Sequence, residues 1–453
     1  MNSNYSPTLN NKKDSKANFT KYNNKTILNK SQSLNKLTNS KNNKFTNDFY
    51  KTDNDNNKRH SVSKIASIKV NNEDNCINEI VNTNIEFSSN SKSNNNNNEN
   101  IKVCLRIRPL NSNEVNRNKK ECLEVLNQFE VNFNSNKSVN KRFRLDYVFH
   151  KESTQEDVFN TCSISSLIDD VLDGYSVTVF AYGQTGSGKT FTIMGKDNVI
   201  TNKNNIISSE FAGLIPNTIT ELWNKISVEI NKNSRKKIYV KASFCEIYNE
   251  SINDLLYTPS KNLHVRFSSN QGFFAEGLLI ADCITADDVI EVIVEGNKNR
   301  KVGSHHLNPD SSRSHSLLTI YIKTEDLENS ITKYGKITFV DLAGSERLKE
   351  SGSSGGMIKE TGNINKSLLI LGKVISCLAD KKNDKKHIPY RDSKLTMLLM
   401  DSIGGSSKTL MISCVSPSME WAEETLSTLN YSSKSMNIQN RPTIKVTLQL
   451  LII

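Results

Sequence analysis

The sequence has few of the features that mark secreted, zinc-binding or membrane-spanning proteins. It contains 8 cysteines in 453 residues, and none of them forms a Cys-x-x-Cys pair or lies beside a histidine cluster. This spacing excludes the common zinc patterns and is typical of reduced thiols in a cytosolic protein. The chain does not open on a charged end followed by an apolar run, and the apolar run LQLLII at 448–453 is far shorter than the roughly 20 residues that cross a bilayer. We therefore expect no secretion signal and no membrane span.

Residues 1–100 have few aromatic residues and lack the periodic apolar pattern of a folded domain. They are rich in Asn, Lys and Ser and end in SSNSKSNNNNNEN. Such a composition cannot bury enough apolar surface to offset the entropy lost on ordering, so it predicts a disordered tail over 1–100. A sustained heptad pattern is also missing, so we expect that dimerisation is not encoded in this chain.

Acidic residues are outnumbered by basic ones, with 48 Asp and Glu against 59 Lys and Arg and a formal net charge of +11. A surplus of this size suits a polyanionic partner, because it strengthens long-range attraction without specifying the partner's shape. Nucleic acid, an acidic membrane surface and an acidic protein lattice are all compatible with the charge alone.

Strands and helices alternate along the foldable part of the chain. Apolar, β-branched runs predict strands at IKVCLRIRPL, RFRLDYVF, SVTVFAY, KIYVKASFCEIYN, HSLLTIYIKT, YGKITFVDLA and KTLMISCVSP. Helices are predicted for the amphipathic stretch TQEDVFNTCSISSLIDDVLDG and for residues 214–230, 357–380, 392–402 and 420–437. This order of elements predicts an α/β domain built around a central sheet.

The stretch FAYGQTGSGKTFTIMG, residues 180–195, fits the phosphate-loop pattern G-x-x-x-x-G-K-[ST] at every fixed position and follows a predicted strand. The glycines let backbone N–H groups face phosphates, Lys189 supplies a positive charge, and the Thr190 hydroxyl can ligate Mg²⁺. The predicted phosphate-binding residues are Gly183, Gln184, Thr185, Gly186, Ser187, Gly188, Lys189 and Thr190. The loop alone does not distinguish a kinase, a GTPase, an ATPase and a motor.

Two later segments have the composition of loops that sense the terminal phosphate. DLAGSE, residues 341–346, follows the apolar strand KITFV, which places Asp341 where a carboxylate can hold the Mg²⁺ shell and brings the Gly344 N–H near a phosphate oxygen. NPDSSRSHS, residues 308–316, gathers hydroxyls, an arginine and a histidine just before a strand. The pair predicts a nucleotide switch. The guanine-selective pattern Asn-Lys-x-Asp occurs at 11–14, in the predicted tail, and is treated as chance.

Taken in order, the motifs resemble a kinesin motor domain. The match covers about residues 101–442 through RIRP, FAYGQTGSGKT, EIYNESINDLL, NPDSSRSHS, VDLAGSE, INKSLLILGKVI, HIPYRDSKLT and MISCVSP. The resemblance implies a P-loop NTPase fold over 101–437, with a central, mostly parallel or mixed sheet flanked by helices on both faces. It also implies ATP and Mg²⁺ as ligands, microtubules as the partner and a place on the cytoskeleton in the cytoplasm, and it argues against nucleic acid as the partner.

The resemblance assigns roles to individual residues of the site. Ser312 in the first switch is expected to contact the γ-phosphate, the attacking water and Mg²⁺, with Thr190 as a second metal ligand. Arg313 is expected to pair with Glu346 of the second switch, and this latch positions the water, whose proton Glu346 accepts through a relay. The residues expected to border the adenine are Arg106, Arg108 and Pro109. The remaining switch residues are Ser314, Asp341 and Gly344.

The same resemblance explains the basic surplus, since microtubules are strongly acidic. We expect a salt-sensitive interface on the helix and loops after the second switch. Its predicted residues are Lys359, Lys366, Lys381, Lys382, Lys385, Lys386, Arg391 and Lys394.

The stretch SKSMNIQNRPTIKV resembles the neck linker of kinesins, and we assign residues 438–453 to this neck-linker-like segment. Its place after the motor favours plus-end movement, and the family's stalk is missing from the chain. The leading hypothesis is ATP hydrolysis stimulated by microtubules and coupled to movement along them. Two alternatives stay open: a microtubule-binding ATPase that regulates or depolymerises filament ends without stepping, and a nucleic-acid-binding P-loop ATPase.

Overall fold

The computed structural model describes residues 98–135, 140–196, 210–259, 262–269, 271–305, 311–346, 356–380 and 387–448. Side chains are described throughout these ranges except at 302–305, 311 and 356–365. All of the described residues fall within 92–453, one of the two units into which the chain divides. The predicted tail therefore lies outside the described residues, apart from its last three positions.

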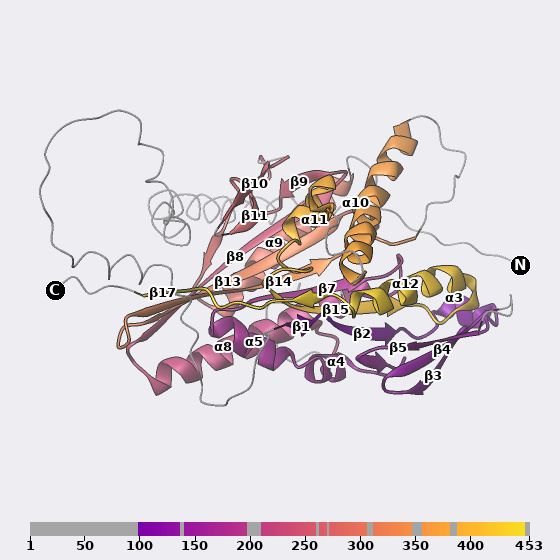
Figure 1. Ribbon diagram of the computed structural model, residues 1–453, viewed down its shortest axis with the longest axis horizontal. Coiled ribbons are helices and arrows are strands. Elements are labelled where there is room, and N and C mark those ends of the chain that lie inside the picture. Colours follow the sequence, from indigo (N-terminus) through magenta and orange to yellow (C-terminus); the bar gives the residue numbers. More distant parts are fainter. Residues whose placement is uncertain are drawn as a thin grey trace, which may run out of the picture. The chain divides into compact units, whose positions relative to one another are not determined.

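A mixed central sheet organises the domain, and ten strands belong to it in the described part of the chain. They are β2 (Lys102–Ile107), β6 (Tyr147–Phe149), β7 (Ser176–Tyr182), β8 (Lys236–Tyr248), β9 (Ser251–Asp254), β12 (Ala281–Cys283), β13 (His315–Asp326), β14 (Ile331–Asp341), β15 (Lys408–Val415) and β17 (Val446–Leu448). The order is β12-β8-β13-β14-β7-β15-β2-β6, with β17 beside β14 and β9 beside β8 (Figure 1).

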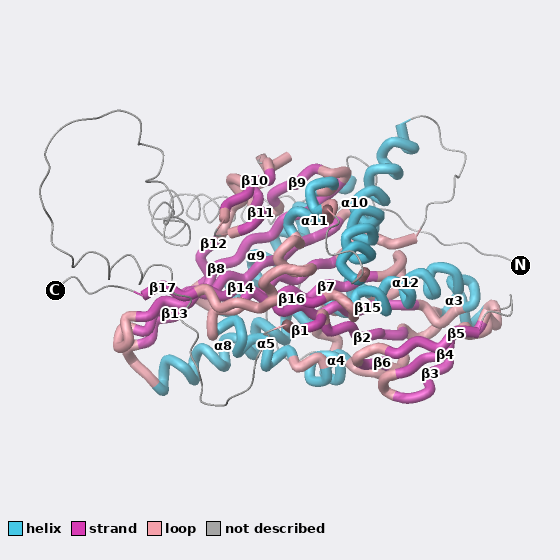
Figure 2. Tube along the Cα trace, viewed as in Figure 1, coloured by secondary structure: helices cyan, strands magenta, loops and turns pink. Residues whose placement is uncertain are grey.

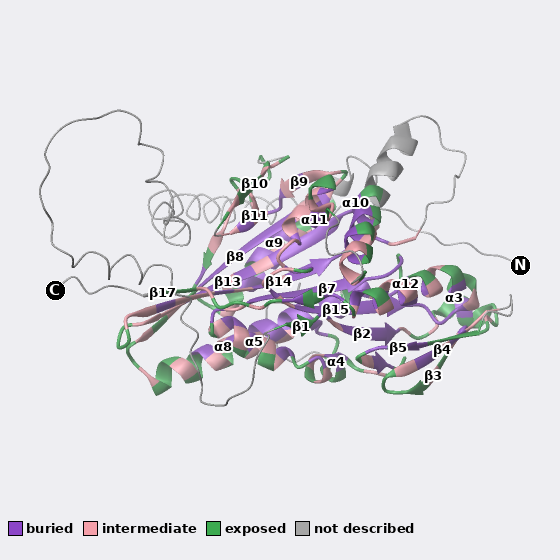
Figure 3. Ribbon diagram, viewed as in Figure 1, coloured by how far each residue is buried: buried purple, intermediate pink, exposed green. Residues whose placement is uncertain are grey.

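The two halves of this sheet differ in strand direction. The pairs β14–β7, β7–β15, β15–β2 and β2–β6 are parallel, whereas β12–β8, β8–β13 and β13–β14 are antiparallel. All seven residues of β7, SVTVFAY, are buried, as expected for a strand covered on both faces (Figure 3). The predicted phosphate loop begins where β7 ends, which places it at the carboxyl edge of the parallel strands, where ligands bind in open α/β sheets.

Helices cover both faces of the sheet (Figure 2). The helices over one face are α4 (Gln155–Thr161), α5 (Ile164–Leu172), α8 (Leu214–Lys232) and α9 (Ala286–His305). Those over the other are α10 (Gly356–Ala379), α11 (Lys394–Leu398) and α12 (Ala422–Ser435). Alternate residues of β7 divide between two apolar cores, with Val177 and Val179 in the first and Phe180 in the second. The predicted α/β fold with helices on both faces is confirmed, and no helix in the described ranges is long and apolar enough to span a membrane.

The local structure differs from the sequence-based prediction in several places. The amphipathic stretch at 154–174 forms two helices, because Ser163 between α4 and α5 adopts a left-handed φ of 58°. The predicted strand RFRLDYVF is divided between β6 and a small three-stranded sheet that was not predicted. That sheet contains β3 (Leu123–Asn127), β4 (Glu130–Asn134) and β5 (Asn140–Arg144). Strands β3 and β5 are largely exposed and polar, and the apolar alternation of β4, with Val131 and Phe133 buried, covers only five residues.

Candidate nucleotide site

The phosphate loop connects β7 to the short helix α6 (Lys189–Ile193) and has the backbone that its glycines allow. Gly183, Gly186 and Gly188 have φ values of +147°, +73° and +101°, a region that residues with a Cβ rarely adopt. At Gly183 a Cβ would also collide with the carbonyl oxygen of Cys414 on β15. The loop can therefore curl tightly, and the three glycines place no Cβ between the loop's N–H groups and a phosphate, as a phosphate cradle requires.

Lys189 is buried at the base of this loop, with 7% of its surface exposed. Its Nζ donates to the carbonyl oxygens of Gly183 at 2.9 Å and Gln184 at 2.8 Å. Burial lowers the pKa of the Lys189 ammonium, and the nearby Asp341 carboxylate opposes this shift. The side chain is thus a positive charge held inside the loop, placed to meet the charge of a phosphate.

Thr190 and Asp341 form the oxygen-rich edge of the site. Thr190 Oγ1 donates to Asp341 Oδ2 at 2.7 Å, and Arg300 Nη1 lies 4.0 Å from the same carboxylate oxygen. The other oxygen, Asp341 Oδ1, is buried without a hydrogen-bond partner among the described residues. A buried carboxylate oxygen beside a hydroxyl suits a hard cation or its bound water, so these residues fit Mg²⁺.

The phosphate loop and the two predicted switch loops are joined by direct hydrogen bonds. The Gly344 N–H donates to the Ser312 carbonyl at 2.8 Å, which connects the two predicted switch loops. The Ser345 N–H donates to the Gly183 carbonyl at 3.1 Å. Glu346 accepts from the Thr185 N–H at 2.8 Å and, through a short hydrogen bond, from the Thr185 hydroxyl. Movement of one loop therefore changes the contacts of the other two.

These contacts bear on the roles expected for the switch residues. The carboxylate of Glu346 is bonded to the phosphate loop at Thr185, while Arg313 lies half-buried in the 3-10 helix η2 (Ser311–Arg313), so their latch stays a prediction. The Gly344 N–H is engaged by Ser312, and contact with a phosphate oxygen requires release of that bond. Arg300 on α9 was not predicted from the sequence, and it donates to the Ser314 hydroxyl at 3.2 Å and to the Ser314 carbonyl at 3.0 Å.

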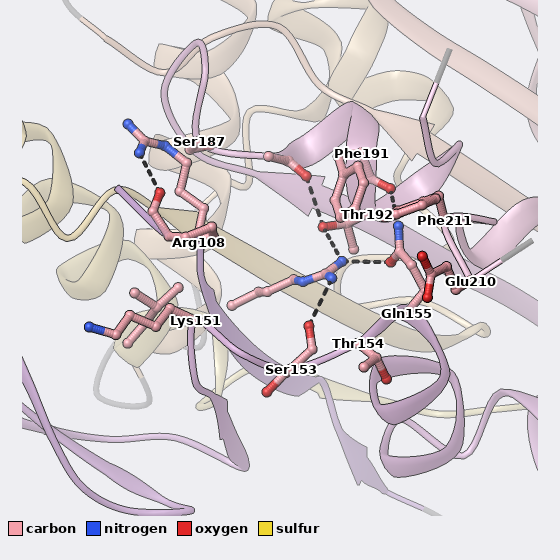
Figure 4. A pocket seen from close by; sticks show the side chains of 14 residues that line it. Arg108, Lys151, Ser153, Thr154, Gln155, Ser187, Phe191, Thr192, Glu210 and Phe211 are labelled. Atoms are coloured by element: carbon pink, nitrogen blue, oxygen red, sulfur yellow. Dashed lines mark hydrogen bonds between the residues drawn. The ribbon is translucent and has the colours of Figure 1, made fainter. Parts of the chain in front are cut away.

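A cavity of about 270 Å³ opens beside the phosphate loop (Figure 4). The three residues expected to border the adenine line this cavity. The lining residues include Arg106, Arg108, Pro109, Lys151, Ser153, Thr154, Gln155, Ser187, Phe191, Thr192, Glu210 and Phe211. Phe191 and Pro109 contribute apolar surface to the lining, and Lys151 and Glu210 are exposed. Phe191 follows the phosphate loop directly, and its position in GKTFT is the sequence signal that would have identified it.

Arg106 and Arg108 play different parts in this cavity. Arg106 is buried, and its Nη1 donates to Gln155 Oε1 at 2.8 Å and to Thr192 Oγ1 at 3.0 Å while its guanidinium lies 5.2 Å from the Phe191 ring centre. Arg108 donates to the Gly186 carbonyl at 2.8 Å and forms an ion pair with Glu114 at 2.7 Å. Arg106 thus builds the cavity wall, and Arg108 ties the wall to the phosphate loop.

Only part of the predicted basic interface lies in the described residues. Lys366 is exposed on α10, and Arg391 is exposed with its guanidinium 5.9 Å from the centre of the Phe273 ring. Lys394 is half-buried and its Nζ donates to Asn262 Oδ1 at 3.1 Å. The side chains that fall outside the described residues are those of Lys359, Lys381, Lys382, Lys385 and Lys386.

The C-terminal segment is bonded along the sheet. Strand β16 (Gln439–Asn440) pairs with β1 (Glu99–Asn100), and β17 pairs with the start of β14. Between these strands the Lys445 N–H donates to the Gly174 carbonyl at 3.0 Å, and the Tyr334 N–H donates to the Lys445 carbonyl at 2.9 Å. The segment therefore stays bonded to the sheet. Its strand β17 lies beside the first residues of β14, just before the residues of β14 that pair with β7.

Comparison with known proteins identifies the family. Residues 106–438 match the model of the kinesin motor domain. The chain is 39% identical over 362 residues to Kinesin-like protein KIF27 of Mus musculus and 40% identical over 352 residues to the kinesin heavy chain of Syncephalastrum racemosum. Each match covers 77% of this chain, but only 25% and 36% of those relatives' own lengths.

A solved structure supports the same assignment. It is that of a fast kinesin, described for its ATPase mechanism and its interactions with microtubules, and it superposes with a TM-score of 0.70 at 36% identity. The superposition covers 78% of this chain and 96% of the solved one. The chain thus belongs to the kinesin family and carries its motor domain.

Proposed function

We propose that this domain hydrolyses ATP and that the state of its nucleotide sets how firmly it binds microtubules. The observation that carries the proposal is the set of hydrogen bonds that join the phosphate loop to both switch loops, through Gly183, Thr185, Ser312, Ser345 and Glu346. A change at the terminal phosphate is felt by all three loops at once. The membership of the kinesin family supports ATP as the nucleotide and the microtubule as the partner.

Binding of ATP follows from the two neighbouring regions of the site. The cavity beside Phe191 and Pro109 accepts the adenine between apolar surfaces, and the loop N–H groups with Lys189 accept the phosphates. Thr190 and Ser312 would hold Mg²⁺, with Asp341 holding its shell through the unpartnered oxygen. When bound, Mg²⁺ neutralises charge on the β- and γ-phosphates.

Hydrolysis requires a positioned water more than a covalent catalyst. Ser312 supplies a hydroxyl and Gly344 an N–H for the terminal phosphate, and this N–H becomes available once its bond to the Ser312 carbonyl is released. Glu346 lies at the entrance to the phosphate loop, bonded to Thr185, and becomes the acceptor of the water's proton when the latch with Arg313 forms. The residues act by orienting the water and the phosphate.

Microtubule binding uses the basic side chains after the second switch. Lys366 and Arg391 are exposed, and an acidic polymer would attract them over about 8 Å at physiological salt. Helix α10 bears Lys366 and begins after the second switch, so it connects the phosphate sensors to the interface. The bonded C-terminal segment supports plus-end transport, because it provides an element that can pair with the sheet or leave it.

The test is the ATPase rate of the full chain with and without microtubules. We expect stimulation by microtubules and none by DNA or RNA, and stimulation by nucleic acid alone would contradict the proposal. Gliding of filaments over immobilised chain would show transport, which we expect. Shortening at filament ends would instead favour a microtubule-binding ATPase that regulates or depolymerises filament ends without stepping.

A further inference from the structure

We propose that His315 is a positioning residue that ties both phosphate-sensing loops to helix α10, and so carries the nucleotide signal to the microtubule-binding surface. The inference rests on the proposed coupling of nucleotide and microtubule binding, and it names the side chains through which the coupling passes.

The imidazole of His315 makes two hydrogen bonds to separate elements. Nδ1 accepts from the Ala343 N–H at 2.9 Å, and Nε2 lies 2.7 Å from Ser367 Oγ. Because Nδ1 accepts, a neutral ring carries its proton on Nε2 and donates it to the serine. His315 therefore contacts the second switch with one nitrogen and α10 with the other, while its own backbone continues the first switch into β13.

The ring is sealed from solvent in this position. His315 is 2% exposed and Ser367 is 3% exposed. Burial, together with the positive charges of Arg300 and Lys189, lowers the pKa of His315 to about 3, so the ring is neutral as the bonding pattern requires. Water cannot replace either bond, so displacement of one loop must move the ring or break a buried hydrogen bond.

Both attachment points are close in sequence to residues with expected roles. His315 follows Arg313 by two residues, and Ala343 lies between Asp341 and Gly344. Rearrangement of either loop at the terminal phosphate thus acts on the ring over a distance of one or two residues.

On the far side, Ser367 connects the ring to the outer surface of α10. Its neighbour Lys366 is exposed, as is Lys373 almost two turns further on. The inner face of the helix packs into the core through Leu371 and Val374. A shift imposed at Ser367 therefore moves the exposed lysines with the rigid helix.

Ser367→Ala tests the inference, because it removes the hydroxyl that meets Nε2 and leaves the cradle intact. In the wild-type chain we expect microtubule affinity to differ between ADP and a non-hydrolysable ATP analogue. In Ser367→Ala the ratio of the two dissociation constants should fall by about fivefold or more, with basal ATPase in the absence of microtubules within about twofold of wild type. Ser367→Cys, which keeps the volume but offers a weak partner, should behave in the same way.

Ser376→Ala is the matched control, since it makes the same change at an exposed position of the same helix. It should keep the wild-type ratio of dissociation constants. Ser367→Thr, which retains a hydroxyl, should keep most of that ratio. A wild-type ratio in both Ser367→Ala and Ser367→Cys would overturn the role of His315. Equal affinities in the wild-type chain itself would instead contradict the proposed function.

Discussion

Glu346 occupies the most informative position among the single residues of the site. Its carboxylate accepts two hydrogen bonds from Thr185, although the family resemblance predicts that it pairs with Arg313. The contact with Thr185 holds the carboxylate at the phosphate loop. Its oxygens keep further lone pairs, so the pairing with Arg313 is compatible with this contact and stays a prediction.

Glu346→Ala should separate binding from chemistry. Because the cradle residues are unchanged, we expect the dissociation constant for ATP to stay within about threefold of wild type, while kcat with microtubules falls on the order of 100-fold through loss of the proton acceptor. Steady-state ATPase and nucleotide titration measure the two quantities. Glu328→Ala, at an exposed turn between β13 and β14, is the control, and near-normal turnover in Glu346→Ala would contradict the assignment.

At this scale the sequence predicted residues that lie in contiguous motifs and missed those brought together by the fold. The phosphate loop places Lys189 and Thr190 by local spacing alone, so both were predicted. Arg300 was missed because its contact with Ser314 depends on how α9 packs beside the first switch. The bond from His315 to Ser367 joins residues 52 positions apart, and nothing in either local sequence indicates it.

Among the elements, the C-terminal segment is anchored by one buried side chain in addition to its backbone hydrogen bonds. Asn440 is 2% exposed, and its Nδ2 donates to the carbonyls of Ser402 at 2.9 Å and Ser407 at 2.6 Å, while its Oδ1 accepts from the Gly404 N–H at 2.8 Å. Asn440 therefore fixes the start of the segment to the loop before β15. The pairing of β17 with β14 extends from that anchor.

Asn440→Ala should release the segment without affecting the nucleotide site. Leaving several buried partners unsatisfied costs about 2–4 kcal/mol, enough to favour the unpaired form. We expect gliding velocity to fall about fivefold or more while ATPase stays close to wild type. Asn437→Ala, just after α12, removes an exposed side chain that donates to the Ser433 carbonyl in the last turn of that helix, and it should glide normally. Unchanged velocity in Asn440→Ala would show that the paired segment does not drive movement.

The elements themselves were predicted in proportion to their burial. Strands β7 and β15 are buried almost throughout and were predicted close to their bounds, because burial leaves a clear signal in the sequence. Strand β14 is only partly buried and was predicted from Tyr334 instead of Ile331. The hairpin of β10 (Val265–Ser268) and β11 (Gly272–Ala275) was missed, since it is half-exposed and short.

For the whole molecule, the net charge of +11 acquires meaning only from its placement. Charge alone could not choose among nucleic acid, membrane and protein lattice. Exposed Lys366 and Lys373 on the helix that also bears Ser367 place part of the charge on an element connected to the phosphate sensors. A polymer bound there would sense the nucleotide, and the nucleotide site would sense the polymer by the same coupling free energy.

The most direct test is to measure microtubule affinity by co-sedimentation with the nucleotide site empty, filled with ADP and filled with a non-hydrolysable ATP analogue. A coupling of 1–3 kcal/mol predicts that the tightest and weakest of the three states differ by about 5–150-fold. Three equal affinities at the same salt concentration would contradict the account.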